Sequence, residues 1–292
     1  MDHLRSTKIW VVLFLLPTFI IYVAFYLGPV VTVIATSFTD WYRFDRPTFV
    51  GLDNYIQLFT WDNRFVLSLR NMALWALIRA TIHVGFGVVV AFVLHRKPVG
   101  HRFVLTIFMV PNIISIAAWA VMYRFMFHSE IGIVNNALQW LISEDFYVRW
   151  LFEMPYAFIV VAVINLFYSV ITCLLVLNGL NAIPQEVHEA SLLDGATPWQ
   201  QTWLIRLPLI RNAVGTAVIL ALWSQVTMFE AIELTTRGGP GNETYHLSLM
   251  LVRGLINQQY GYTNAVATIM LIMGVIIMLT VHRSFRMDEK YY

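Results

Sequence analysis

The sequence predicts an all-α integral membrane protein with six transmembrane helices and a two-helix loop on the cytoplasmic side. Apolar residues make up 59% of the 292 residues and charged residues only 12%, and the mean hydropathy is +0.67. A soluble domain needs about 25% charged residues to cover its surface. The charges are also clustered, and the stretches between them reach the roughly 20 residues that a helix needs to cross a bilayer core of about 30 Å.

Six segments are long and apolar enough to be spans. They are residues 9–36, 71–94, 103–127, 154–179, 212–234 and 264–282. The first segment is too long for the apolar region of a signal peptide, and no small-x-small cleavage site follows it, so we expect a retained anchor. We expect residues 1–292 to form a single transmembrane domain.

The distribution of Lys and Arg predicts that both termini lie in the cytoplasm. Six spans place the termini on the same side, and the segments that would then face inward hold ten basic residues: Arg5, Lys8, Arg96, Lys97, Arg102, Arg206, Arg211, Arg283, Arg286 and Lys290. The longer outer loops hold seven: Arg43, Arg46, Arg64, Arg70, Arg149, Arg237 and Arg253. Cytoplasmic segments of membrane proteins carry the higher density of Lys and Arg.

The inner loop over residues 180–211 has the signals of two short helices. Pro184 suits a first helical turn, where its missing N–H is no loss, and Gly195 suits a helix end that needs positive φ. Apolar residues recur at helical spacing on one face: Val187, Ala190 and Leu193. A second helix is expected to begin with the capping box Thr197-Pro198-Trp199-Gln200 and to be limited by Pro208. On shape alone, the first helix could equally lie on lipid headgroups.

This loop resembles the EAA motif of the permease subunits of binding-protein-dependent ABC importers. The matching residues are Glu189-Ala190-Ser191, then Gly195 after a gap of three residues, then Ile205-x-Leu207-Pro208 after a gap of nine. Ser191 stands where the motif has a second Ala. Other segments resemble the maltose-type carbohydrate permeases over nearly the whole chain: Leu16-Pro17, Ser37–Trp41, Phe49–Tyr55, Pro111–Trp119, Gly132-x-x-Asn135 and Gly179–Pro184. Thr236-x-Gly238-Gly239-Pro240 is similar to the larger permease of the maltose importer's pair.

The resemblance implies a permease subunit of an ATP-driven sugar importer in a bacterial plasma membrane. The implied partners are a second related permease subunit, two ATPase subunits that hold ATP and Mg, an extracytoplasmic sugar-binding protein, membrane lipid and a carbohydrate substrate. The chain itself would bind no cofactor, and its net charge of +2 gives no basic excess for nucleic acid. In this family the loop forms a coupling helix that docks on an ATPase subunit, which implies contacts by Glu189, Ala190, Ser191, Asp194 and Gly195.

Polar residues inside the spans are candidates for the substrate pathway, because polar groups are costly in a bilayer. Asn165, Tyr168 and Thr172 share one face of the fourth span, and Tyr168 supplies a ring on which a sugar can stack. The fifth span adds Trp223, Gln225, Thr227 and Glu230. Gln225 and Glu230 are about 140° apart on an ideal helix, so at most some of this second group can line a cavity. Each residue could instead make a helix–helix contact.

Arg79 and His83 are four residues apart in the second span. They could face the interior of the permease, or Arg79 could extend its charged end to the membrane interface. We favour a structural polar contact outside the substrate cavity. That placement argues against an anionic substrate.

The alternatives are a membrane-embedded enzyme and a secondary carrier. His188-Glu189 begins like HExxH, but position 192 is Leu, so a zinc site is not expected. The sequence has no GxSxG, and Arg237–Gly241 lacks the Lys-Ser or Lys-Thr of a phosphate-binding loop. The single Cys173 excludes an internal disulfide. A carrier would need coupling carboxylates near the midplane, and Glu230 is the one candidate. Neither alternative accounts for the inner loop, and the sequence leaves the identity of the sugar open.

Overall fold

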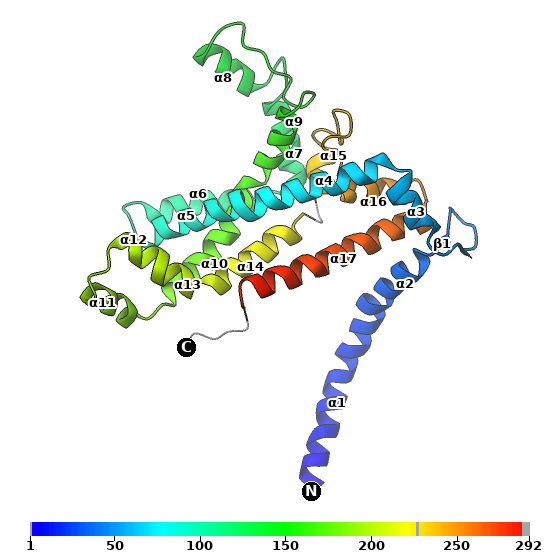
Figure 1. Cartoon of the computed structure of the whole chain (residues 1–292), viewed down its shortest axis with the longest axis horizontal. Coiled ribbons are helices and arrows are strands. Elements are labelled where there is room, and N and C mark those ends of the chain that lie inside the picture. The colour runs from blue at the N-terminus through cyan, green and yellow to red at the C-terminus, as the bar shows by residue number, and fades with distance from the viewer. Residues whose placement is uncertain (1, 226–227, 288–292) are drawn as a thin grey trace. The chain divides into compact units, whose positions relative to one another are not determined.

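The computed structural model describes residues 2–225 and 228–287, and this part of the chain is mainly helical (Figure 1). Four described helices are long and apolar enough to cross a membrane: Trp10–Thr36, Asn63–His95, Tyr156–Asn181 and Tyr260–Ser284. Two more are bent pairs: His101–Ile113 with Ile116–Met126, at 98°, and Pro198–Leu209 with Arg211–Trp223, at 67°. The count reaches six if each pair is one span. The predicted helical membrane fold is confirmed.

The chain divides into two compact units. The first consists of Met1–Asp62 and Met250–Leu271, and the second of Asn63–Leu249 and Ile272–Tyr292. Two helices contribute residues to both units: α16 (Leu247–Ile256) and α17 (Tyr260–Ser284).

The first unit joins a long apolar helix to a small hairpin. Its remaining elements are α1 (Asp2–Tyr22), the π-helical η1 (Val23–Leu27), α2 (Gly28–Thr36), β1 (Thr39–Asp40), β2 (Thr48–Phe49) and α3 (Asp53–Thr60). β1 and β2 are antiparallel, with Thr39 opposite Phe49. The Asn54 side chain donates to the carbonyls of Ser37 and Thr39, both at 2.9 Å, and fixes the hairpin to the end of α2.

The second unit holds most of the helices. They are α4 (Asn63–Ile78), η2 (Arg79–His83), α5 (Val84–His95), α6 (His101–Met109), η3 (Val110–Ile113), α7 (Ile116–Met126), α8 (Ile133–Leu141), α9 (Tyr156–Ile164), η4 (Leu166–Tyr168), α10 (Ser169–Asn181), α11 (Gln185–Leu193), α12 (Pro198–Gln200), η5 (Gln201–Arg206), α13 (Leu207–Leu209), α14 (Arg211–Trp223) and α15 (Phe229–Glu233). η2 and η5 are π-helical, and η3 and η4 are 3₁₀ turns.

Helices α5, α10 and α14 pack together and enclose an apolar core. This inner core consists of Ala91, Leu94, Cys173, Val176, Leu180 and Ile210. Gly87 lets α5 approach α10 closely, because a Cβ there would lie 2.6 Å from the carbonyl oxygen of Ser169. Gly179 serves the contact of α10 with α14, since its Cβ would lie 3.1 Å from that of Ala213.

Three segments that the hydropathy predicts as continuous helices are interrupted. The segment 103–127 contains η3 and bends by 98°, the segment 154–179 contains η4, and in the segment 212–234 α14 ends at Trp223, six residues before α15 begins. Pro111 explains the first break, because a proline has no N–H for the helical ladder. Hydropathy measures only how apolar a segment is, so it does not detect these interruptions.

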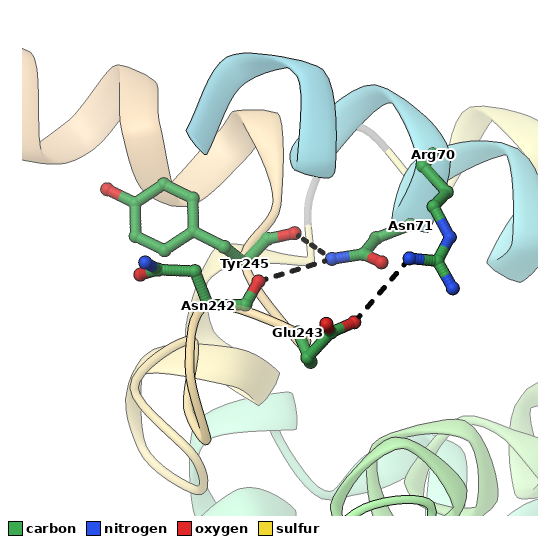
Figure 2. A network of polar contacts seen from close by, with 5 residues as sticks. All are labelled: Arg70, Asn71, Asn242, Glu243 and Tyr245. Atoms are coloured by element: carbon green, nitrogen blue, oxygen red, sulfur yellow. Dashed lines mark hydrogen bonds and ion pairs between the residues drawn. The ribbon is translucent and has the colours of Figure 1, made fainter. Parts of the chain in front are cut away.

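On the side opposite the inner loop, polar side chains fix the connecting segments of the second unit. Figure 2 shows the Asn71 amide donating to the carbonyl of Tyr245 at 2.9 Å, while Arg70 lies 3.8 Å from the carboxylate of Glu243. In the segment 128–153, buried Asn135 donates to two backbone carbonyls and accepts from a Trp side chain. The loop segments therefore have defined conformations.

Candidate substrate cavity and coupling segment

A cavity of about 100 Å³ lies in the second unit, at the level of the three helix interruptions. Residues of η2, α7, η4, α10, α14 and α15 contribute to its wall. Polar side chains in this wall include Arg79, His83, Asn165, Tyr168, Thr172 and Ser224. Irregular backbone inside a membrane is tolerated where it is buried in protein or lines a cavity, and this arrangement meets that condition.

Side chains near the cavity form hydrogen bonds with backbone carbonyls at or beside the helix interruptions. The Tyr168 hydroxyl donates to the Ile114 carbonyl at 3.2 Å, and the Trp119 indole donates to the Pro111 carbonyl at 2.9 Å. The Asn165 amide donates to the carbonyl of Val161 at 3.2 Å. These bonds stabilise the breaks, because a backbone carbonyl left unpaired in an apolar environment is costly.

The structure brings together the three predicted pathway residues of the fourth span. Asn165, Tyr168 and Thr172 all line the cavity, with Asn165 and Thr172 buried and Tyr168 partly exposed. Of the four candidates of the fifth span, Trp223, Gln225 and Glu230 are not in the lining, and Trp223 is exposed. Gln225 is buried with both amide atoms unpaired among the described residues, and Glu230 is exposed. Thr227 lies outside the described residues.

Arg79 and His83 also line the cavity, so the expectation that they lie outside it is wrong. Only 5% of Arg79 is exposed, and its guanidinium donates to the hydroxyl of Ser224, beside the break in the fifth span. Arg79 and His83 bound the π-helical turn η2, which changes the direction of the side chains relative to a regular helix. Such single π-turns recur at functional sites. The sequence signal that could have drawn attention to Arg79 is a full charge within a span.

The coupling segment, which we define as α11 through Gly195, has a fully formed helix end. Gly195 has a φ of +73°. Its N–H donates to the Leu192 carbonyl and the N–H of Ala196 donates to the Ser191 carbonyl, both at 3.0 Å. This is a Schellman motif, which favours Gly at the left-handed position. The predicted capping box at Thr197 and Gln200 is confirmed, with both reciprocal bonds present.

Most residues of the coupling segment point away from the chain. Glu189, Ala190, Asp194 and Gly195 are exposed, and 90% of Leu193 is accessible. Ser191 is the exception at 5%, because it faces inward and its hydroxyl donates to the His188 carbonyl. The roles predicted for these residues in docking remain predictions.

The flanks of the coupling segment are attached to the inner core. Ile183 precedes α11 and Leu207 follows it, and both pack against the core formed by α5, α10 and Ile210. Pro208 lies within α13 and the helix ends one residue after it, at Leu209, before the 67° bend into α14. The segment is thus an exposed helix held at both ends by the membrane-spanning core.

Comparison with known proteins identifies the family to which the chain belongs. The model of the family described as "binding-protein-dependent transport system inner membrane component" matches residues 83–287. The chain belongs to this family. It is 31% identical to the probable ABC transporter permease protein YurN of Bacillus subtilis, over 98% of this chain and 99% of that protein. It is 28% identical to the multiple sugar-binding transport system permease protein MsmF of Streptococcus mutans, over 96% and 97%.

A solved structure supports the same fold. A chain of a bacterial ABC transporter involved in the import of the acidic polysaccharide alginate superposes with a TM-score of 0.82 and 21% identity, over 99% of this chain and 98% of that chain. Our permease is therefore a multi-pass inner-membrane component of a binding-protein-dependent transport system, with the helical arrangement of ABC permeases. As the family membership implies, it is a transport component without a catalytic site of its own, which sets the enzyme alternative aside.

Proposed function

We propose that this permease is the larger-permease-like subunit of an ATP-driven sugar importer in the bacterial plasma membrane. It would pair with a second related permease subunit, two ATPase subunits and an extracytoplasmic sugar-binding protein. Relatives along almost the whole chain are named for sugar uptake, among them MsmF and the diacetylchitobiose uptake permease NgcF of Streptomyces coelicolor. The motif Thr236-x-Gly238-Gly239-Pro240 favours the larger-permease position.

Both termini would lie in the cytoplasm. Within the second unit, the Arg211 guanidinium donates to the Arg286 carbonyl at 3.0 Å. This contact puts the C-terminal end of α17 beside the start of α14, where the loop 180–211 ends. The excess of Lys and Arg in the inner segments supports the same orientation.

The observation that carries the proposal is the exposed, capped coupling segment. Its acidic residues Glu186, Glu189 and Asp194 are exposed, and α11 contains no Lys or Arg. A helix that lies on the cytoplasmic leaflet should be basic, because that leaflet is anionic. A basic groove on a partner protein fits this acidic helix better than the membrane surface does. We therefore assign the segment to docking on the ATPase subunit, with Glu189 paired to a basic group there.

Transport would follow from movement of this segment. Closure of the ATPase subunits on ATP displaces α11, and Ile183 and Leu207 pass the displacement to α10 and α14, which carry part of the cavity wall. Tyr168 offers a stacking face to the sugar, and Asn165 and Thr172 offer hydrogen bonds. A cavity of about 100 Å³ is smaller than the several hundred Å³ of typical ligand sites, so the pathway must widen to admit a sugar. Widening would bring the unpaired amide of Gln225 and the carboxylate of Glu230 into the pathway.

The test compares two glycines with the same backbone conformation. Gly195 and Gly100 both have positive φ, at +73° and +82°, and a Cβ on either would meet no atom of the chain within 4 Å. Replacing each by Trp therefore imposes a similar backbone strain, of about 1–2 kcal/mol. Gly195→Trp and Glu189→Ala should abolish co-purification of the ATPase subunit and ATP hydrolysis stimulated by the binding protein. Gly100→Trp should retain both. Normal association and hydrolysis in the Gly195 and Glu189 variants would contradict the assignment.

A further inference from the structure

We propose that Arg79 forms an oxyanion-binding subsite in the cavity, so that the saccharide carried by this permease bears an acidic group. The acidic group would be a carboxylate, sulfate or phosphate, which offer the same charged acceptor oxygens. This inference rests on the proposed import function and adds the chemical class of the substrate.

The first argument is the uncompensated charge of Arg79. A guanidinium keeps its charge at neutral pH and has five N–H donors. Among the described residues, its hydrogen bond goes to the neutral hydroxyl of Ser224, and no acidic side chain lies within ion-pair distance. The two residues of the fifth span outside the described range are Val226 and Thr227, neither of which is charged. A buried charge without an anion is costly, so a ligand anion would complete the site.

The second argument is the composition of the cavity wall. No acidic side chain lines the cavity among the described residues, and Glu230 is exposed outside it. Two neutral donors of the wall make bonds within the chain, because the Asn165 amide bonds to Val161 and the Tyr168 hydroxyl bonds to Ile114, while the buried Ser169 hydroxyl has no partner among the described residues. These neutral groups can bind a sugar hydroxyl, whereas Arg79 supplies the charged donors of the wall. A guanidinium matches the geometry of two oxygens on one acidic group.

The third argument is the size of the space beside Arg79. His83 stands at the far end of the same π-helical turn and lines the same cavity at 7% exposure, but its ring is hydrogen-bonded to the backbone of Ala162. A neutral imidazole has a single N–H, so the donors to the anion come from Arg79. That space has the volume of a few water molecules, each about 30 Å³, which suits a single acidic group rather than a whole saccharide.

The experiment uses the complete importer, with both permeases and the ATPase subunits, in lipid nanodiscs. The probes are glucuronate and glucose, which differ at one position by a carboxylate in place of a hydroxymethyl group. Saturation-transfer NMR measures the affinity of each probe. We expect glucuronate to bind at least tenfold more tightly than glucose, because hydrogen bonds between charged groups are about twice as strong as neutral ones. Equal affinities, a preference for glucose, or no binding of glucuronate would overturn the proposal.

Three variants separate charge from structure. Arg79→Gln should abolish the preference for glucuronate, and Arg79→Lys should retain part of it, because the ammonium keeps the charge without the planar pair of donors. Arg124→Gln is the matched control: it makes the same change at an exposed arginine of α7 that does not line the cavity, and it should leave the preference intact. An unchanged preference in Arg79→Gln would overturn the assignment to this residue.

Two further measurements identify the source of the anion and distinguish a failure of the subsite proposal from a failure of the proposed import function. Nanodiscs of phosphatidylcholine and of phosphatidylglycerol should give the same preference. Displacement of glucuronate by phosphatidylglycerol would indicate that a lipid phosphate occupies the subsite, and would overturn the saccharide assignment. ATP hydrolysis stimulated by the binding protein is measured on the same samples. A coupled importer that prefers glucose refutes the oxyanion subsite alone, whereas loss of coupling in the wild type refutes the proposed function.

Discussion

Replacing Asn135 by Ala is expected to release the segment 128–153 from its folded conformation. The Asn135 side chain is 1% exposed and makes three hydrogen bonds. Its amide donates to the Ser129 carbonyl at 2.7 Å and to the Val148 carbonyl at 2.9 Å, and its oxygen accepts from the Trp150 indole at 2.7 Å. The Asn135 side chain therefore connects the beginning of the segment, at Ser129, to its end, at Val148 and Trp150.

The magnitude of the expected destabilisation follows from the number of hydrogen bonds that are lost and from their burial. Each hydrogen bond contributes about 1 kcal/mol net, so three give about 3 kcal/mol, and more if the partners stay buried and unpaired. The close approach of backbone at Gly132 leaves little room for relaxation, since a Cβ there would lie 2.2 Å from the His128 carbonyl oxygen. A loss of about 3 kcal/mol makes local opening roughly a hundredfold more frequent.

Hydrogen exchange followed by mass spectrometry, on the purified permease in detergent, measures this opening. Amides bonded within the segment report it, for example those of Asn136 and Ile142, which donate to the carbonyls of Gly132 and Leu138. The matched control is Gln139→Ala, which removes one bond, from the Gln139 amide to the Phe146 carbonyl at 3.1 Å.

The control should lose about 1 kcal/mol, roughly a fivefold change in opening. If Asn135→Ala and Gln139→Ala exchange at the same rate, Asn135 does not hold the segment in the way its contacts indicate.

Two further predictions concern the same side of the second unit. Asn71→Ala should lower the free energy of unfolding in detergent by about 1–3 kcal/mol, because it removes a buried hydrogen bond to the Tyr245 carbonyl. Arg70→Ala should cost less than about 1 kcal/mol, since the ion pair of Arg70 with Glu243 is solvent-exposed (Figure 2). Equal losses for the two variants in chemical denaturation would contradict this ranking. Burial, with a smaller effect of the Arg79 charge, lowers the pKa of His246 from its usual 6.5 to about 3, so the unfolded chain binds more protons between these values and stability should fall as pH drops from about 6.5 towards 3. His246→Phe should make the denaturation midpoint less dependent on pH over this range. If the midpoint of the variant changes with pH as much as that of the wild type, groups other than His246 cause the dependence.

The helical membrane class could be predicted because it depends on composition and length, which are properties of the sequence itself. The end of α11 at Gly195 and the capping box at Thr197 could be predicted for a similar reason. Both depend on local chemistry, a positive φ in one case and a reciprocal pair of hydrogen bonds in the other. Such signals act within four or five residues, so no tertiary information is needed to read them.

The wall of the cavity could be predicted only in part. Asn165, Tyr168 and Thr172 share a face at helical spacing, and that face does line the cavity even though η4 interrupts the helix. Arg79 was assigned elsewhere because its direction depends on the π-helical turn and on Ser224, which is 145 residues away in the sequence. Contacts between distant segments decide such a placement, and one sequence read by periodicity does not contain them.

The close packing of α10 explains how an exposed segment can influence a cavity far from it. α10 has 13 residues and so extends roughly 20 Å, with Thr172 in the cavity wall near one end and the connection to α11 at the other. Gly87 and Gly179 allow α5 and α14 to contact α10 so closely that sliding of one helix past another would produce overlap. A displacement of α11, as in the proposed coupling to the ATPase subunit, would therefore move these helices together as a block. The strain would then be taken up where the helices are already interrupted, and those interruptions lie at the cavity.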